Sequence, residues 1–164
     1  MSPQVAARFD TGQEGGGAAE KEQMVLSPVG VIRTPYKKQG DAPRQGYLSD
    51  AVCTLELFSG YEPGLKDVEK ASHLIVLYWC HKADRNKLQT RTPFGETIRG
   101  VFATRSPSRP NPIAVCVAEL LEVDGKRLKV RGLDALDGSP LLDIKPYYPS
   151  NDAVCDAWLE LPEK

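Results

Sequence analysis

Short β-prone runs, separated by segments rich in proline and glycine, make up most of this sequence. Asp124-Gly125 between two of these runs is typical of a tight hairpin turn. Helical patterns are limited to 63–70 and to one turn within 153–159. The sequence therefore predicts an all-β fold: a small closed or nearly closed β-barrel of about seven strands, with one or two short helices. The expected strands are 29–33, 52–58, 73–81, 98–104, 113–123, 127–133 and 141–147.

A single folded domain is expected after a polar N-terminal segment. Residues 1–25 are rich in Gly, Glu, Gln and Ala and offer little to bury, which predicts a disordered tail followed by a domain over 26–164. The length suits one domain with a core of its own. The longest apolar run, 74–80, is too short to cross a bilayer, and no apolar signal-peptide core is present. We therefore expect a cytoplasmic location and no membrane partner.

The residues that commonly build metal or nucleotide sites are sparse. The four cysteines are scattered without a C-x-x-C spacing, and His73 and His81 are the only histidines, so we expect buried free thiols and no metal site. No G-x-G-x-x-G or G-x-x-x-x-G-K-[ST] string is present, which counts against dinucleotide-binding and P-loop proteins. A G-x-S-x-G elbow and the glycine-rich loop of Rossmann-type methyltransferases are also missing.

Charge is distributed unevenly along a chain whose net charge is −1. Residues 81–109 hold seven Lys or Arg against two acids, giving +5, whereas residues 119–164 hold ten acids and six bases, giving −4. A local basic stripe of this kind suits an anionic partner such as RNA. Solvated charges on a loop are an equally open interpretation.

The segment 100–112, GVFATRSPSRPNP, is the first dense cluster of functional candidates. Its three prolines fix φ and remove backbone donors, so it cannot continue a central strand and is predicted to form a stiff loop. The loop presents Arg105, Arg109 and Asn111 in a narrow range of positions. Two guanidinium groups on a rigid loop indicate a site that recognises an anion.

The segment 133–147 is the second cluster and ends in alternating polar residues. After a turn at 137–140, Asp143, Lys145 and Tyr147 occupy every second position, so an extended chain would project them from one face. An acid, a base and a phenol on one face indicate a polar pocket wall. A surface strand with an exposed polar face is the alternative.

Together these strings resemble the signature of the TsaA-like (YaeB, TrmO) family. The matching strings are GVFATRSPSRPNPI, DALDGSPLLDIKPYYP, VGVIRTPYK, PRQG and LKDVEKASHLIVLYWCH, which together run from 29 to 152. The resemblance implies an S-adenosylmethionine-dependent methyltransferase on a small β-barrel that forms homodimers, with the methyl donor near the subunit interface. The best-known activity methylates the exocyclic amino nitrogen of threonylcarbamoyladenosine at position 37 of tRNA.

The resemblance also implies roles for individual residues. Arg105 follows the alanine–threonine pair and would grip the carboxylate of the methyl donor. Arg109 or a basic residue of 82–91 would bind the carboxylate of the threonylcarbamoyl group, and Asn111 is the other expected substrate-binding residue. From their alternation in the DIKPY string, and not from the resemblance, we expect Asp143, Lys145 and Tyr147 to border the acceptor pocket, with Asp143 or Tyr147 receiving the proton of the acceptor nitrogen. An ion pair that holds the barrel closed is the alternative for each charged residue. The expected cofactor-binding residues are Pro43, Arg44, Gln45, His81, Lys82, Arg105, Val115, Asp137, Gly138, Ser139 and Pro140.

Two departures from the family pattern keep other functions open. Members usually have glycine after the NPI string and often serine two residues later, where this sequence has Ala114 and Cys116. Better-characterised members also carry a C-terminal extension that helps to hold tRNA, whereas this sequence ends at Lys164. A methyltransferase of the same barrel acting on a small molecule, and a non-catalytic S-adenosylmethionine-binding module, are therefore the alternative expectations.

Overall fold

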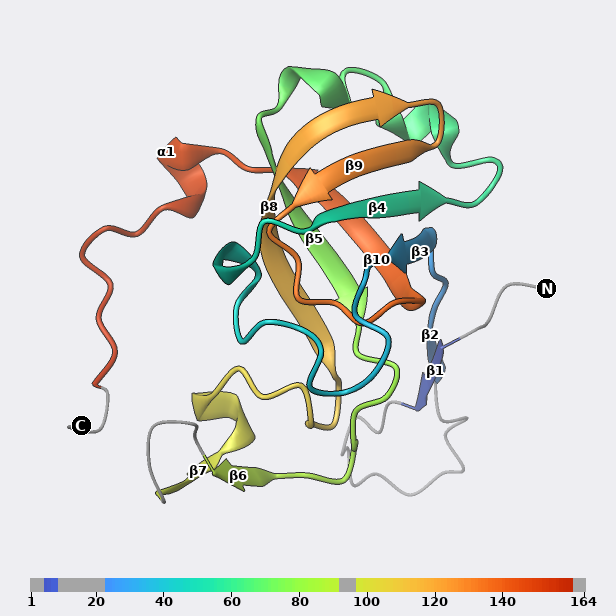
Figure 1. The fold of residues 1–164 in the computed structure, drawn as a ribbon. Coiled ribbons are helices and arrows are strands. Elements are labelled where there is room, and N and C mark those ends of the chain that lie inside the picture. Colours follow the sequence, from blue (N-terminus) through green and yellow to red (C-terminus); the bar gives the residue numbers. More distant parts are fainter. Residues whose placement is uncertain (1–4, 9–22, 92–96, 161–164) are drawn as a thin grey trace, which may run out of the picture.

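Six antiparallel strands close into a barrel at the centre of the molecule (Figure 1). The structure, a computed structural model, describes residues 5–8, 23–91 and 97–160. Around the barrel the strand order is β10-β3-β4-β9-β8-β5. The predicted all-β barrel is confirmed, with six strands in the wall. They are β3 (Gly30–Arg33), β4 (Val52–Leu57), β5 (His73–Trp79), β8 (Ile113–Asp124), β9 (Arg127–Arg131) and β10 (Ser139–Pro146).

The core fills the inside of the barrel because apolar residues alternate along the strands. Leu55 in β4, Val76 in β5 and Leu128 in β9 are completely buried, and their neighbours in sequence face outward. Between β8 and β9 the chain turns at Gly125, whose φ of 54° suits the predicted hairpin. The buried side chains of the strands thus form one apolar cluster inside the barrel.

Strand β10 closes the barrel by pairing with β3 at its start and with β5 along the rest of its length. Ser139 lies opposite Ile32, and Lys145 lies opposite Ile75. The register shifts between Leu141 and Asp143, so β10 bends where it passes from one neighbour to the other.

The prediction of a seventh strand over 98–104 is wrong beyond residue 100. Strand β7 (Ile98–Gly100) pairs with β6 (Gln89–Arg91) in a small sheet outside the barrel, and the chain then turns into the 3-10 helix η4 (Val101–Ala103). Thr104 N–H donates to the Val101 carbonyl at 3.2 Å, which closes the turn. Val101 is buried as the anchor of this turn instead of as a strand residue.

Helical structure is short, as expected. The predicted helix over 63–70 forms two 3-10 turns. A hydrogen-bonded turn forms within 153–159, where Ala157 N–H donates to the Val154 carbonyl at 3.2 Å, and the short helix α1 lies just before it. No helix in the described residues is long and apolar enough to span a membrane. The helical elements are η1 (Gly46–Leu48), η2 (Glu62–Leu65), η3 (Val68–Lys70), η4 and α1 (Pro149–Asp152).

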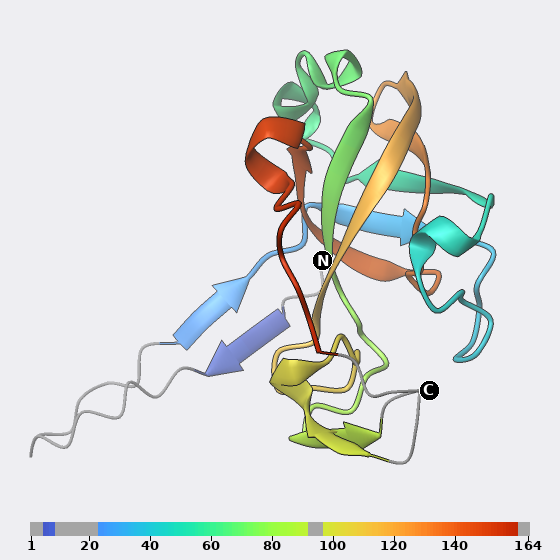
Figure 2. The same ribbon diagram turned by 90° about the vertical axis from the view of Figure 1, so that its left-hand side faces the viewer.

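A second small sheet precedes the barrel. Strands β1 (Val5–Arg8) and β2 (Gln23–Leu26) pair antiparallel and extend away from the barrel (Figure 2). They fall in or beside the segment 1–25, of which residues 1–4 and 9–22 lie outside the described residues. The domain boundary at 25/26 stays a prediction.

Candidate functional site

Three long loops leave the same end of the barrel and carry most of the predicted site. They connect β3 to β4 (34–51), β5 to β8 (80–112) and β9 to β10 (132–138), at the lower end in Figure 1. All predicted cofactor residues except Val115 lie in these loops or at the start of β10. Arg109 and Asn111 lie there too. Residues far apart in sequence thus meet at one end because the strands alternate in direction.

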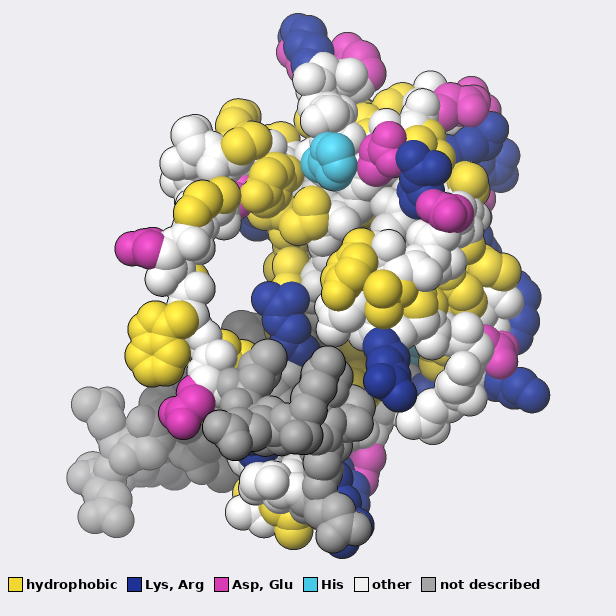
Figure 3. All heavy atoms as spheres, turned by 60° about the vertical axis from the view of Figure 1, so that its left-hand side comes forward, with side chains coloured by type: hydrophobic (Ala, Val, Ile, Leu, Met, Phe, Trp, Pro, Cys, Tyr) yellow, Lys and Arg dark blue, Asp and Glu magenta, His cyan; other side chains and the backbone are white. Residues whose placement is uncertain are grey.

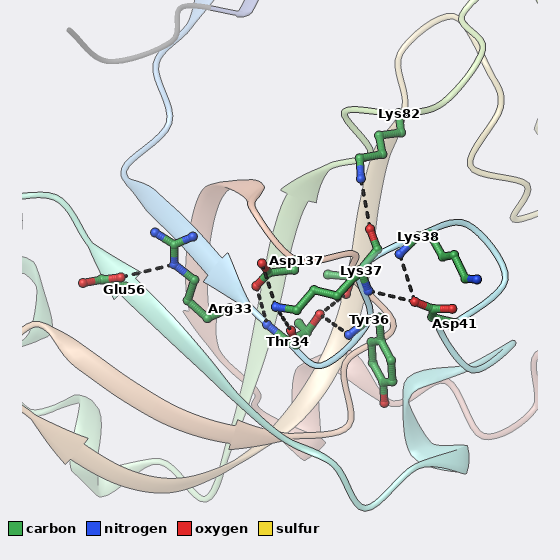
Figure 4. Close-up of polar contacts among 10 residues, drawn as sticks. Arg33, Thr34, Tyr36, Lys37, Lys38, Asp41, Glu56, Lys82 and Asp137 are labelled. Carbon is green, nitrogen blue, oxygen red and sulfur yellow. Dashed lines mark hydrogen bonds and ion pairs between the residues drawn. The ribbon is translucent and has the colours of Figure 1, made fainter.

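The turn at Asp137-Gly138 is built into this end of the barrel. Ser139 N–H donates to the Leu136 carbonyl at 3.1 Å, and Gly138 has a φ of 79°, the left-handed value that a type II turn needs at its third position. The Asp137 carboxylate accepts from Thr34 N–H at 3.0 Å and pairs with Lys37 at 2.9 Å (Figure 4). The Lys37 ammonium, followed by the Thr34 N–H, lowers the pKa of Asp137. This acid is therefore a fixed negative charge at the mouth of the barrel.

His81 and Lys82 tie the second loop to the other two. The Ser139 hydroxyl, which is buried, lies 3.3 Å from His81 Nδ1. Partial burial, and next the Lys82 charge, lower the pKa of His81. Lys82 Nζ donates to the Lys37 carbonyl at 3.1 Å (Figure 4). The Asp137 turn, the β3–β4 loop and the His81–Lys82 pair therefore form one connected cluster.

The predicted Pro43-Arg44-Gln45 element sits just before η1. Arg44 is exposed, and its two neighbours are half-buried. The following residue, Gly46, lies so close to Gly132 that a Cβ there would stand 1.8 Å from the Gly132 carbonyl oxygen. This close backbone contact, which only glycine permits, fixes where the element stands.

The proline-rich loop is braced by one of its two predicted arginines. Arg109 Nη2 donates to the Val101 carbonyl and, at 2.6 Å, to the Thr104 carbonyl. Its Nε is buried and has no hydrogen-bond partner among the described residues. Arg105 is exposed, and none of the polar contacts of the described residues involves its side chain. Arg105 is thus available to a ligand, whereas Arg109 already holds the loop.

The three predicted catalytic residues are spread along and beyond β10. Asp143 pairs with Lys145 at 2.5 Å and accepts from Ile144 N–H at 2.9 Å. Tyr147 follows the far end of β10, where its N–H donates to the His73 carbonyl. At about 3.3 Å per residue, Tyr147 lies roughly 26 Å along the strand from Ser139. The structure places Asp143 nearest to the loop end and does not bring Tyr147 to it.

A polar cluster at the loop end of the barrel was not assigned any role from the sequence. The Tyr78 hydroxyl donates to Asp134 Oδ1 at 2.5 Å, and the Cys116 thiol donates to the same oxygen at 2.9 Å. Burial, and then the nearby charges, raise the pKa of Tyr78 far above its usual range and that of Cys116 to about 12. Asp134 belongs to the same string as Asp137, which was the available signal. Cys116 supplies a second donor to this carboxylate.

The other thiols and the acidic groups give no indication of a metal centre. All four cysteines are free; Cys53 is buried, whereas Cys155 is exposed, contrary to the expectation of burial. Within residues 25–91 and 97–160, no three His, Cys, Asp or Glu side chains are grouped to hold a metal ion.

The outward face of β8 is apolar and solvent-exposed. Ile113, Val115 and Val117 expose 40–49% of their area, and they lie beside the half-buried Ile75 and Leu77 of β5. Figure 3 shows hydrophobic side chains gathered on this side, with an opening between them and the C-terminal segment. Val115 is therefore set apart from the other predicted cofactor residues, on the outer surface of the wall.

An open cleft adjoins this face between η1 and β8. Tyr47, Glu119 and Arg131 are among the residues that line it. Glu119 and Arg131 form an ion pair across adjacent strands. No predicted site residue lines the cleft, although part of its lining (Tyr47, Ser49, Asp50 and Gly132) belongs to the loops at the loop end of the barrel.

Comparison with known proteins agrees with this architecture. An S-adenosyl-L-methionine-binding protein of Archaeoglobus fulgidus is 57% identical over 131 residues, which cover 80% of this chain and 94% of that protein. A crystal structure of TrmO superposes with a TM-score of 0.73 at 38% identity, and one of TrmO from Pseudomonas aeruginosa with 0.70 at 38%. These alignments cover 88% and 84% of this chain but only 65% and 62% of the crystal chains. The family model of the tRNA-methyltransferase O N-terminal domain matches residues 31–153, and the chain belongs to this family.

Proposed function

We propose that this protein is an S-adenosylmethionine-dependent methyltransferase that modifies the exocyclic amino nitrogen of threonylcarbamoyladenosine at position 37 of tRNA. The observation that carries the proposal is the meeting of three loops at one end of the barrel. The Asp137 turn, the His81–Lys82 pair and the β3–β4 loop are joined there by direct hydrogen bonds and an ion pair. Membership of the family supports the methyl donor and the reaction class.

The side chains at this end fit the chemistry of S-adenosylmethionine. The donor carries a carboxylate, an ammonium, a sulfonium and an adenine, and when bound it supplies an electrophilic methyl group. Arg105 is exposed and suits the carboxylate. Asp137 holds a negative charge beside which a cationic group is favourable. Arg44 is exposed at the same end of the barrel, so its side chain is accessible to a ligand there. The contact between Gly46 and Gly132 fixes the position of its loop.

In this proposal, a residue of β10 removes the proton from the acceptor nitrogen. The exocyclic nitrogen of adenine is a weak nucleophile because its lone pair is delocalised, so holding it in line with the methyl carbon supplies much of the rate. Asp143 then accepts the nitrogen's proton, and Lys145 balances the carboxylate charge in the resting protein. Tyr147 can take this part only where another subunit or the RNA brings the acceptor to the far end of β10.

A homodimer is the second part of the proposal. The exposed apolar face of β8 is the surface best suited to a second copy, because covering Ile113, Val115 and Val117 removes apolar area from water. Val115 would then reach the methyl donor from the interface. The mass of the protein in solution tests this, and a monomer at all concentrations would exclude it.

A non-catalytic S-adenosylmethionine-binding module is the second candidate function. The observation that favours it is the relative from Archaeoglobus fulgidus, which matches over 94% of its length and is named only as a binding protein. The chain also covers less than two thirds of the TrmO crystal chains.

Two measurements separate the candidates. Calorimetry with S-adenosylmethionine compares the wild type with Arg105→Ala and with Arg127→Ala, a control on the opposite end of the barrel that pairs with Glu56. Losing a charged hydrogen bond predicts about 10- to 150-fold weaker binding for Arg105→Ala alone. Tritiated methyl transfer is then measured on tRNA with and without threonylcarbamoyl. Label that depends on this group supports the proposal, and donor binding without any transfer supports the binding module.

A further inference from the structure

Phe102 stands out because 83% of this large aromatic side chain is exposed on a turn that is firmly held. The preceding residue, Val101, is completely buried, and its N–H donates to the Leu88 carbonyl at 3.0 Å. Arg109 bonds the carbonyls of Val101 and Thr104, on either side of Phe102. The ring therefore projects from a braced turn, and its exposure is a built feature of the fold.

Basic residues lie on the same loop connection as the ring, and the Val101–Leu88 hydrogen bond brings the turn next to Lys87. Lys87 and Arg91 are exposed on the same loop connection, and no acidic side chain of the described residues pairs with them. Arg85 is not available in the same way, because it donates to the Pro110 carbonyl and lies 5.3 Å from the Trp79 ring centre. Lys87 and Arg91 thus remain for a ligand on the connection that carries the exposed aromatic ring.

An aromatic platform among cations matches the chemistry of unpaired RNA. A nucleobase stacks on the ring, while the adjoining phosphates meet the Lys and Arg side chains. An acidic peptide would satisfy the cations but leave the ring uncovered, and an apolar protein surface would cover the ring but desolvate the cations. We propose that Phe102 stacks on an unpaired base of the substrate RNA and that Lys87 and Arg91 contact its backbone. The inference rests on the proposed function, whose RNA substrate it positions.

Three variants test this inference. Phe102→Ala removes the ring, Phe102→Trp keeps an aromatic face, and Tyr61→Ala removes a partly exposed aromatic residue near η2 at the opposite end of the barrel. Affinity is measured for an anticodon stem-loop with 2-aminopurine in its loop, whose fluorescence falls when the base stacks. We expect Phe102→Ala to bind about 5- to 150-fold more weakly and to lose the fluorescence quenching, with the tryptophan variant close to wild type.

The outcomes distinguish this inference from the proposed function. If wild type and Phe102→Ala bind and methylate the RNA equally, the stacking role is overturned while the methyltransferase proposal stands. If wild type binds S-adenosylmethionine but neither binds nor methylates the RNA, both fail. A higher KM for RNA in Phe102→Ala, with the affinity for S-adenosylmethionine unchanged, supports the inference.

Discussion

The contact between Tyr78 and the carboxylate of Asp134, in the β9–β10 loop, leads to a specific prediction for Tyr78→Phe. Tyr78 is 4% exposed, and its hydroxyl donates to Asp134 at 2.5 Å. The variant removes one oxygen from the core and leaves the carboxylate with the Cys116 thiol as its remaining partner. A hydrogen bond to a charged group contributes about 1.5–3 kcal/mol, so the free energy of unfolding should fall by that amount. For a chain of this length, a loss of 2 kcal/mol corresponds to a Tm lower by about 4–8 °C.

Tyr36→Phe provides a matched control for this measurement. Tyr36 is 8% exposed, and its hydroxyl donates to the neutral Ser49 Oγ at 2.7 Å. The same oxygen is deleted at similar burial, but the partner carries no charge, so the expected loss is about 0.5–1.5 kcal/mol. Urea unfolding at neutral pH, followed by circular dichroism, measures both variants. If Tyr36→Phe costs as much as Tyr78→Phe, or if Tyr78→Phe costs less than about 0.5 kcal/mol, the Asp134 contact does not stabilise the barrel as argued.

Two further predictions follow from the same barrel. Gly46→Ala would place a Cβ against the Gly132 carbonyl and should lower the free energy of unfolding by about 1–3 kcal/mol or more, whereas Gly64→Ala, with open space around it, should not; equal unfolding curves would contradict the close approach. Stability should also fall as the pH rises from 9 towards 12, because the unfolded chain releases the Cys116 proton from about its ordinary value of 9.0 while the folded chain keeps it to about 12. This group contributes a slope of up to about 1.4 kcal/mol per pH unit, so Cys116→Ala should flatten the profile of unfolding free energy against pH, and an unchanged profile would count against it.

Local patterns predicted the barrel but not every turn outside it. Alternation along β4 and the glycine turn after Asp124 are short-range signals, and both act in the structure as expected. The stretch after Gly100 was mistaken for a strand because Val101 and Phe102 favour extended chain. The Arg109 side chain, eight residues after Val101, bonds the Val101 carbonyl and holds the turn. A local sequence pattern does not include this contact.

The candidate site, like the fold, could be predicted from the sequence only in part. The loops that carry Arg44, Arg105 and Asp137 could be named from the sequence strings, and the structure places all three loops at one end of the barrel. The contacts that organise this end could not be predicted from the sequence, because Lys37 and Asp137 come together only once the barrel has closed. The same applies to Tyr78 and Asp134, whose pairing needs two distant segments.

The position of β10 in the wall has a consequence for how the protein is made. Its partners β3 and β5 are synthesised long before it, and β10 supplies the seam between them. During translation the earlier strands can form hairpins, but both free edges stay unpaired until residues 139–146 have left the ribosome. Contacts this distant in sequence form slowly, so the newly synthesised chain passes through an open state with unpaired strand edges. Such edges can pair with other chains and lead to aggregation.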